Sequence, residues 1–218
     1  MMMALAWPLP LSEFFDTLPI ARITSRPGAA NTTSETHGGD VIKHRLGSRL
    51  WGGRIVLDKD HHSAIAAIEA RLSLLDEPGA SFLLWDTRQP HPAADPEKFI
   101  LGSSAPVIEA LNPNNRELDI SGLPAGYILS RGDLLGFTYG ANPTRYAYHR
   151  IATGAVASGA GIAADIEVTP FIRPGAALGA AVTLGNPVLK ATLTTAQYGE
   201  GRSAVTEGGS FNWLQTLR

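Results

Sequence analysis

The chain has 218 residues, of which 44% are hydrophobic and 17% charged, so it has enough apolar material for a folded core and is not a largely disordered protein. A formal net charge of -2 without a dense run of Lys or Arg argues against a surface built to bind nucleic acid. The absence of cysteine excludes disulfides, thiolate metal sites and a cysteine nucleophile.

The first ten residues do not match a secretory signal peptide, because they contain no basic residue and Pro8 and Pro10 interrupt the apolar stretch. No apolar run approaches the roughly 20 residues that a membrane helix requires. We therefore expect a soluble protein, made in the cytoplasm, that does not contact a membrane. Large apolar side chains follow in this segment and are expected to pack on the chain's own sheet or on a neighbouring subunit. They are Trp7, Leu9, Leu11, Phe14, Phe15 and Leu18.

The chain is predicted to be mainly β, since 23 glycines and 15 prolines punctuate short apolar runs along its length. The predicted strands are residues 40–46, 50–57, 81–86, 106–111, 117–121, 134–139, 145–152, 162–168 and 187–195. The clearest alternation lies in residues 162–168, where one face is expected to be buried and the other wet. The predicted buried face consists of Ile162, Ala164, Ile166 and Val168.

One helix is predicted over about residues 61–76, where it covers an exposed sheet face or a barrel end. Asp60 or Ser63 is expected to cap its N-terminus, and Pro78-Gly79 is expected to end it. The apolar residues at helical spacing, which predict its buried face, are Ile65, Ile68, Leu72 and Leu75.

Two segments lack strand patterning. Residues 25–39 are rich in Ser, Thr, Asn and Gly without periodicity and are predicted to form an exposed loop. Residues 86–98 contain three prolines and are expected to wrap the surface, where a loop of this length is often ordered by a partner.

The texture of the sequence changes near residue 113. From residue 117 to about 185 the predicted strands are short and separated by glycine turns, which indicates a small barrel of about five strands. Residues 211–214 are too apolar for a free tail, so the chain is expected to return to the first unit. The first unit then comprises residues 1–112 and 187–218, and residues 113–186 form an inserted module.

The nearest approach to a metal cluster is the histidine pair His61-His62 beside Asp58 and Asp60. Adjacent histidines at a helix start point to different sides, whereas helical ligand pairs usually lie three or four residues apart. We interpret this group as the polar N-terminus of the helix and predict no metal site.

No other motif predicts catalysis or cofactor binding. Neither Gly102-Ser103-Ser104 nor Gly208-Gly209-Ser210 matches a nucleophile elbow, and a carboxylate pair cannot be identified by spacing among the 20 acidic residues. The glycine-rich residues 154–161 lie among short strands and are interpreted as a hairpin turn, not a phosphate loop. We predict no catalytic, cofactor-binding or metal residue, and the sequence does not identify the partner interface.

Aromatic residues are the remaining binding candidates, because they anchor interfaces and line carbohydrate sites. Trp85, inside an apolar strand, is predicted to pack in the core, whereas Trp7 is expected to project from an N-terminal arm. Tyr139, Tyr146 and Tyr148 would supply stacking surface if the module bound oligosaccharides, as OB-like barrels do.

Three groups of short motifs occur in order between about residues 40 and 195. The first is Leu50-Trp51-Gly52-Gly53-Arg54-Ile55, then the helix and Phe82-Leu83-Leu84-Trp85-Asp86 with Pro90 and Pro92 behind it. The second is Gly132-Asp133-Leu134-Leu135 and Tyr148-His149-Arg150-Ile151. The third is Pro170-Phe171-Ile172-Arg173-Pro174-Gly175 and Leu184-Gly185-Asn186-Pro187. Together the series resembles the distal tail proteins of siphophages and related prophages.

The resemblance implies a β-sandwich with one packed α-helix plus a small OB-like β-barrel, and a ring of six copies that joins the tail tube to the hub or baseplate. It implies a structural, non-enzymatic component of the virion tail tip. The expected partners are further copies of the chain, the tail tube protein and the hub or baseplate proteins. No cofactor and no specific nucleic-acid binding are expected, although DNA is expected to pass through the lumen. The resemblance transfers no site residue.

Three alternatives stay open. The chain is a different tail-tube or baseplate component, a carbohydrate-binding module of the tail tip, or a tail-associated peptidoglycan hydrolase, for which no motif speaks. Subunit geometry, glycan binding and turnover of cell-wall substrate distinguish them.

Overall fold

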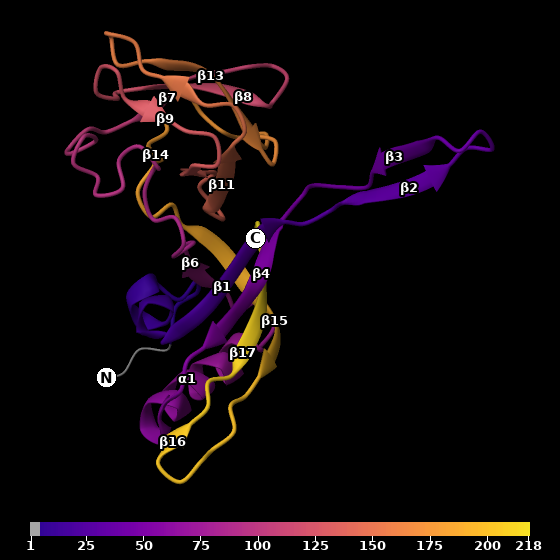
Figure 1. Cartoon of the computed structure of the whole chain (residues 1–218), viewed down its shortest axis with the longest axis vertical. Helices are drawn as coiled ribbons and strands as arrows, with labels where there is room; N and C mark the ends of the chain where they lie inside the picture. Colours follow the sequence, from indigo (N-terminus) through magenta and orange to yellow (C-terminus); the bar gives the residue numbers. More distant parts are fainter. Residues whose placement is uncertain (1–4) are drawn as a thin grey trace.

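The computed structural model describes residues 5–218 and consists of two β bodies joined end to end (Figure 1). A curled five-stranded antiparallel sheet with the order β1-β4-β17-β15-β6 forms one body, and a six-stranded antiparallel sheet with the order β14-β10-β11-β13-β8-β7 forms the other. The predicted fold class, mainly β with a single packed helix and a small barrel-like module, is confirmed.

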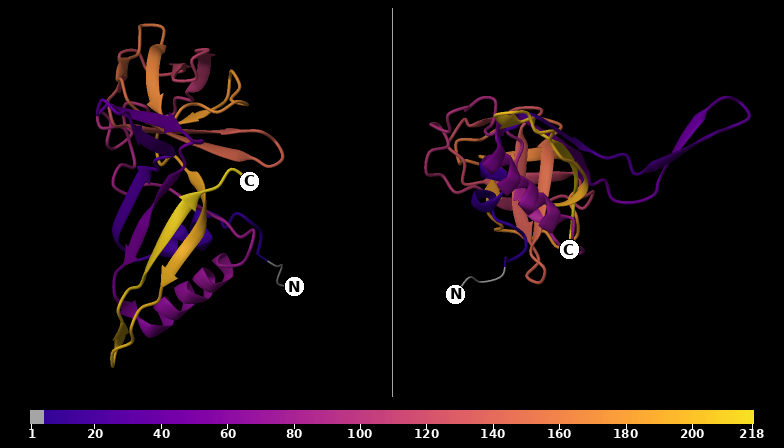
Figure 2. Two further views of the ribbon diagram at one scale, coloured as in Figure 1. Left: turned by 90° about the vertical axis from the view of Figure 1, so that its right-hand side faces the viewer. Right: turned by 90° about the horizontal axis from the view of Figure 1, so that it is seen from below.

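The five-stranded sheet is built from both ends of the chain. Its strands are β1 (Ile20–Pro27), β4 (Trp51–Leu57), β17 (Ser210–Gln215), β15 (Leu189–Gln197) and β6 (Phe82–Leu84). The helix α1 (His62–Leu75) lies across one face of this sheet, and the short 3-10 helices η1 (Leu11–Glu13) and η2 (Phe15–Thr17) pack near β6 (Figure 2). The predicted strand at residues 50–57 agrees with β4, whereas β1 was not predicted.

The core of this body is filled by α1 and by the N-terminal segment. The four apolar helix residues predicted to be buried are the buried residues of α1. Leu9, Phe14, Phe15 and Leu18 are also buried, and Phe14 meets Phe82 edge-on at 5.1 Å between ring centroids. The N-terminal apolar residues therefore pack largely on the chain's own sheet, where each large side chain contributes about 2 kcal/mol. Trp7 lies outside this core and is 41% exposed.

The predicted N-terminal caps of the helix, Asp60 and Ser63, are wrong, whereas α1 ends before Pro78-Gly79 as expected. The residue before α1 is His61, without a side-chain cap, and the Asp60 carboxylate accepts a hydrogen bond from the His61 backbone N–H at 2.6 Å. β5 (Asp60–His61) pairs with β16 (Val205–Thr206), so a strand pairing holds the chain extended up to the first helical residue. Ser63 already lies inside the helix.

The six-stranded sheet almost closes into a barrel. Its strands are β14 (Val182–Thr183), β10 (Leu134–Tyr139), β11 (Arg145–Ile151), β13 (Ala163–Thr169), β8 (Glu117–Ser121) and β7 (Val107–Leu111). A bridge between Val107 and Ala181 and the Val182 N–H donated to the Pro106 carbonyl at 2.8 Å bring the two edges together. β9 (Ile128–Leu129) and β12 (Ala155–Val156) form a separate pair.

The predicted alternation of β13 fails at its first half. Ala163 is buried and Ala164 exposed, the opposite of the prediction, although Ile166 and Val168 are buried as expected. A β-bulge between Ala163 and Ile166 shifts the phase, with Asp165 in the left-handed region at φ 54°. The Asp165 N–H donates to the Asp119 carboxylate at 2.8 Å, which holds the bulge.

The chain leaves the five-stranded sheet after β6 and rejoins it at β15. The predicted division into residues 1–112 with 187–218 and an inserted 113–186 stays a prediction. Two segments before residue 113 belong with the six-stranded sheet: β7 pairs with β8, and Leu101 lies in the apolar core of that body.

A long hairpin projects from the junction of the two bodies. β2 (Asn31–Glu35) pairs with β3 (Val41–Arg45), and every residue of both strands is exposed. The hairpin, which we call the arm, extends away from both bodies (Figure 1; Figure 2, right view). The prediction of an exposed loop at residues 25–39 is right about exposure and wrong about structure.

Gly53 is required by the close approach of β1 to β4. A Cβ built at Gly53 would lie 1.8 Å from the Thr24 carbonyl oxygen, which is backbone and cannot rotate away. We expect Gly53→Ala to lower the free energy of unfolding by about 2 kcal/mol or more, as overpacking does. Urea unfolding of Gly53→Ala and of Gly159→Ala, whose Cβ meets nothing within 4 Å, measures this. Equal stability of the two variants would contradict the packing seen at β1 and β4.

Candidate partner-binding surfaces

The residues weighed for metal or catalytic chemistry do not form a site. His62 Nδ1 lies 2.7 Å from Thr206 Oγ1 and thereby ties α1 to β16, while His61 is exposed in β5. Ser210 accepts a hydrogen bond from Arg54 at 2.7 Å within the five-stranded sheet. Among residues 5–218 no group of three His, Asp or Glu is placed to hold a metal ion.

The tyrosines considered for carbohydrate stacking are not presented together. Tyr148 and Tyr139 are buried at 2% and 7% exposure, and only Tyr146 is half-buried at the surface. Tyr139 of β10 and Tyr148 of β11 are therefore not accessible for stacking, and Tyr146 is the one of the three that a carbohydrate-binding module would have left to use. Trp85, predicted to pack in the core, follows β6 and is only partly buried against the core, with its indole N–H 3.4 Å from an Asp16 carboxylate oxygen.

Trp51 joins the two bodies. Its indole N–H donates to the Tyr148 carbonyl of β11 at 2.8 Å, and its ring meets the Tyr148 ring edge-on at 5.0 Å. The Arg150 guanidinium lies 5.1 Å from the centroid of the same indole. Gln215 adds to the connection. Its side-chain amide accepts a hydrogen bond from the backbone N–H of Trp51 and donates one to the backbone carbonyl of Tyr146. The first residue of β4 and the last residue of β17 are thus hydrogen-bonded directly to β11.

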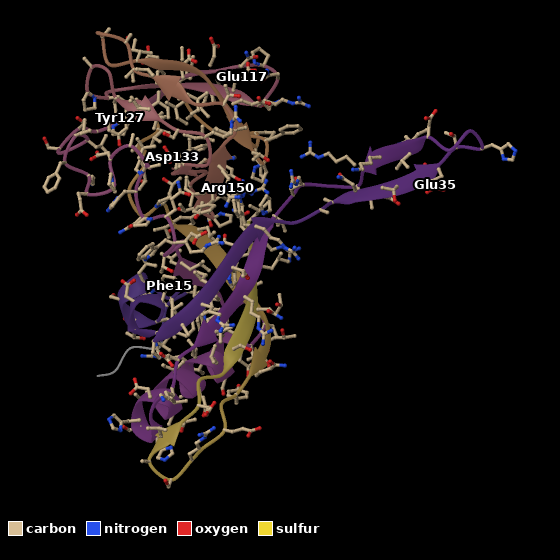
Figure 3. The ribbon with its side chains drawn as sticks, viewed as in Figure 1. Phe15, Glu35, Glu117, Tyr127, Asp133 and Arg150 are labelled. Atoms are coloured by element: carbon tan, nitrogen blue, oxygen red, sulfur yellow. The ribbon has the colours of Figure 1, made fainter. Side chains whose placement is uncertain are left out.

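Asp133 fixes the proline-rich segment to the barrel. Its fully buried carboxylate accepts hydrogen bonds from the Gln89 side chain at 3.0 Å, the Ala93 N–H at 2.9 Å and the Ser130 N–H at 2.7 Å. Figure 3 shows Asp133 and Arg150 near the base of the barrel, where the two bodies meet. Residues 86–98 therefore wrap the junction, ordered by the chain's own barrel.

Asp95 holds the end of the same segment. Burial raises the pKa of its carboxyl, but hydrogen bonds from the Leu101 and Ile100 backbone N–H groups and the Tyr127 hydroxyl outweigh that effect and leave the pKa below its usual value. The charged carboxylate therefore turns the chain so that Leu101 enters the barrel core and Ile100 faces outward.

The arm is the surface most evidently lacking a partner. Its five cross-strand pairs run from Asn31 opposite Arg45 to Glu35 opposite Val41. The apolar side chains of Val41, Ile42 and Leu46 are exposed to solvent, so the rest of the described chain does not bury them. An isolated two-stranded hairpin is marginally stable in water, and its free edges invite pairing with another chain. The arm therefore presents two free strand edges and three apolar side chains to solvent.

A pocket of about 290 Å³ lies at the root of the arm. Arg45, Arg49 and Arg173 line it together with Phe171, whose ring has the Arg45 guanidinium at 4.5 Å and the Arg116 guanidinium at 4.6 Å from its centroid. We call this group the arginine pocket. The arginine pocket lies between the arm, Arg116 immediately before β8 and the Pro170–Pro174 turn, and these three segments form one positively charged surface.

The sequence predicted β3 of the arm, as the strand at residues 40–46, but it did not identify β2, the hairpin or the buried carboxylates. β2 is polar at every position and therefore lacks the apolar alternation that reveals a strand. The available signal was the Gly38-Gly39 pair between two β-prone stretches, a usual hairpin turn. Asp133 belongs to the Gly132-Asp133-Leu134-Leu135 motif, but the hydrogen bonds by which it holds the proline-rich segment come from residues some 40 positions away.

Comparison with known proteins leaves the family undetermined. Neither the protein-family models nor the curated proteins compared with the chain gave a match. None of the helices in residues 5–218 is both long and apolar enough to span a membrane.

His149 is buried within the six-stranded barrel. Its buried imidazole donates from Nδ1 to the Pro170 carbonyl at 2.8 Å and stacks on Phe137 at 5.6 Å between ring centroids. Burial lowers the pKa of His149 to about 4, since the hydrogen bond to Pro170, which favours the charged form, does not offset it, and Arg173 lowers the pKa further. The folded protein thus holds this imidazole neutral.

We expect the stability of the protein to fall between about pH 6.5 and pH 4. In that window the unfolded chain binds a proton at His149 that the folded chain does not, so unfolding is favoured by up to about 3 kcal/mol at the acid end. Urea unfolding of the wild type and of His149→Gln across this range measures the effect. The variant should show a shallower dependence on pH, and identical slopes would contradict the assignment.

Proposed function

We propose that this protein is a structural, non-enzymatic component of a bacteriophage tail tip, where copies form a ring, taken as hexameric, between the tail tube and the hub or baseplate. The arm carries this proposal. It exposes apolar side chains and two free strand edges at a distance from the body, which is the arrangement of an element that lies on a neighbouring subunit.

The proposed ring requires an arm contact that repeats around a closed circle. Because the arm and the surface that would receive it are different parts of the molecule, two copies can exchange arms in a two-fold dimer, or the contact can repeat head-to-tail from copy to copy. Such a contact closes into a ring when the rotation between neighbours divides the circle. The bonded junction at Trp51 supports this role, because it gives the base of the arm a fixed direction.

The ring proposal assigns partners and location together. The tail tube protein and the hub or baseplate proteins contact the two faces of the ring, and the virion tail tip is the site of action. DNA passes through the lumen without specific binding, for which a near-neutral chain is suited.

Removing the apolar character of the arm tests the proposal. We expect the triple variant Val41→Ser, Ile42→Ser, Leu46→Ser to lose assembly, because these side chains are the apolar contact that a neighbour covers. Native mass spectrometry and negative-stain electron microscopy over a range of concentrations measure assembly. A closed ring with an open lumen is the expected wild-type result.

The matched control changes Val156 and Leu178 to Ser, since these side chains are equally exposed but lie on the barrel. The control should assemble as the wild type does. A wild type that stays monomeric at every concentration and does not associate with tail tube or hub proteins would contradict the proposed function.

A further inference from the structure

The arginine pocket has positive charge that the chain itself does not neutralise. Within residues 5–218 the ion pairs are Arg88 with Asp86 and Arg202 with Glu207, and neither involves the pocket. Glu117, the acidic residue next to Arg116, accepts hydrogen bonds from the Asn112 and Asn114 side chains instead.

The guanidinium groups of the pocket contact only uncharged groups. Arg45 donates to the Gly47 carbonyl at 3.1 Å, Arg49 to the Gly28 carbonyl at 3.0 Å, and Arg173 to the Arg49 carbonyl at 3.0 Å. Stacking on Phe171 fixes the planes of Arg45 and Arg116. Neighbouring guanidiniums repel one another unless an anion joins them, and carboxylates and phosphates are the anions that a guanidinium binds with two hydrogen bonds.

The tip of the arm carries the complementary charge. Glu35 and Asp40 flank the turn, and their carboxylates make no hydrogen bond or ion pair within the described part of the chain. The turn itself is ordered, because the Thr36 N–H donates to the Asp40 carbonyl at 2.9 Å and the Gly39 N–H to the Thr36 carbonyl at 2.9 Å. Two free carboxylates are therefore presented on a structured tip.

The tip and the pocket of one molecule cannot meet. Glu35 lies four strand residues beyond the Arg45 end of the hairpin, roughly 13 Å along the strand, and the arm runs away from the body. Figure 3 shows Glu35 far out on the arm, well separated from Glu117 and the barrel. The complementarity can be satisfied only between two molecules.

We propose that the arginine pocket binds the carboxylates of Glu35 and Asp40 on the arm tip of a neighbouring copy. This inference rests on the proposed ring and names the surface that receives the arm. The acidic tip of each copy then lies at the arginine-rich root of the next arm, so the same contact is made at every position around the ring. The pairing of charges sets the register of the contact, while the apolar side chains of the arm supply burial.

Charge reversal tests the pairing. The tip variant carries Glu35→Arg and Asp40→Arg, and the pocket variant carries Arg45→Glu and Arg116→Glu, at side chains exposed in the single molecule. Each variant alone brings like charges together and is expected to associate about tenfold more weakly or worse than the wild type. An Arg131→Glu variant, which changes an exposed barrel arginine outside the pocket, should assemble normally.

Mixing the two variants gives the decisive result. A tip-reversed copy fits the pocket of a pocket-reversed copy, and the acidic tip of the second fits the unchanged pocket of the first. Equal amounts should therefore restore rings in which the two variants alternate, seen by native mass as equal numbers of each chain. The inference would be overturned if the tip variant and the pocket variant each formed rings as the wild type does, or if their mixture formed no rings. Either result would leave the ring proposal standing.

A second measurement does not depend on ring formation. The full-length wild-type chain should bind to immobilised wild-type chain, and the full-length variant Glu35→Gln, Asp40→Asn should bind to it about tenfold more weakly. Binding of the wild type should also weaken between roughly 0.05 M and 0.5 M salt, because exposed charges are screened. Equal binding of the wild type and the variant, or binding of inorganic phosphate without binding of the wild-type chain, would contradict the proposal.

Discussion

The bond from the Trp51 indole to the Tyr148 carbonyl is the contact on which the rest of the molecule depends. It lies where β4 begins, next to β11, with the indole fully buried. Leu134 and Tyr148 of the six-stranded sheet belong to the apolar core of the other body, so the cores meet at this point. Losing the indole N–H would leave a buried carbonyl unpaired, at a cost of about 1–3 kcal/mol.

The arm takes its position from this junction. β1 and β4 flank it, and both belong to the sheet that Trp51 fixes against β11. The arm itself contributes no core, since every residue of β2 and β3 is exposed, and in the proposed assembly a neighbouring copy supplies the burial that the arm lacks. A rigid root with a projecting, uncovered hairpin is the physical basis of the proposed assembly, and the separation of charge between root and tip gives that assembly a direction.

Local patterns predict much of this fold, and contacts distant in sequence account for what they miss. The limits of β8 and β10 and the buried face of α1 follow from spacing alone. The phase of β13 does not, because its bulge depends on the Asp119 carboxylate, which is supplied by another strand. The candidate surfaces were hidden for the same reason: β2 has no buried face to create a pattern, and the arginine pocket unites residues that lie far apart in the chain.

Hydrogen exchange of the arm tests the central claim most directly. In dilute protein the backbone amides of residues 31–45 should exchange quickly, because a solvated hairpin opens readily, whereas those of β10 and β11 should be protected. On assembly the account predicts strong new protection of the arm, with little change in β10 and β11. An arm that exchanges as quickly in the assembled protein as in the dilute one would contradict the claim that a neighbour covers it.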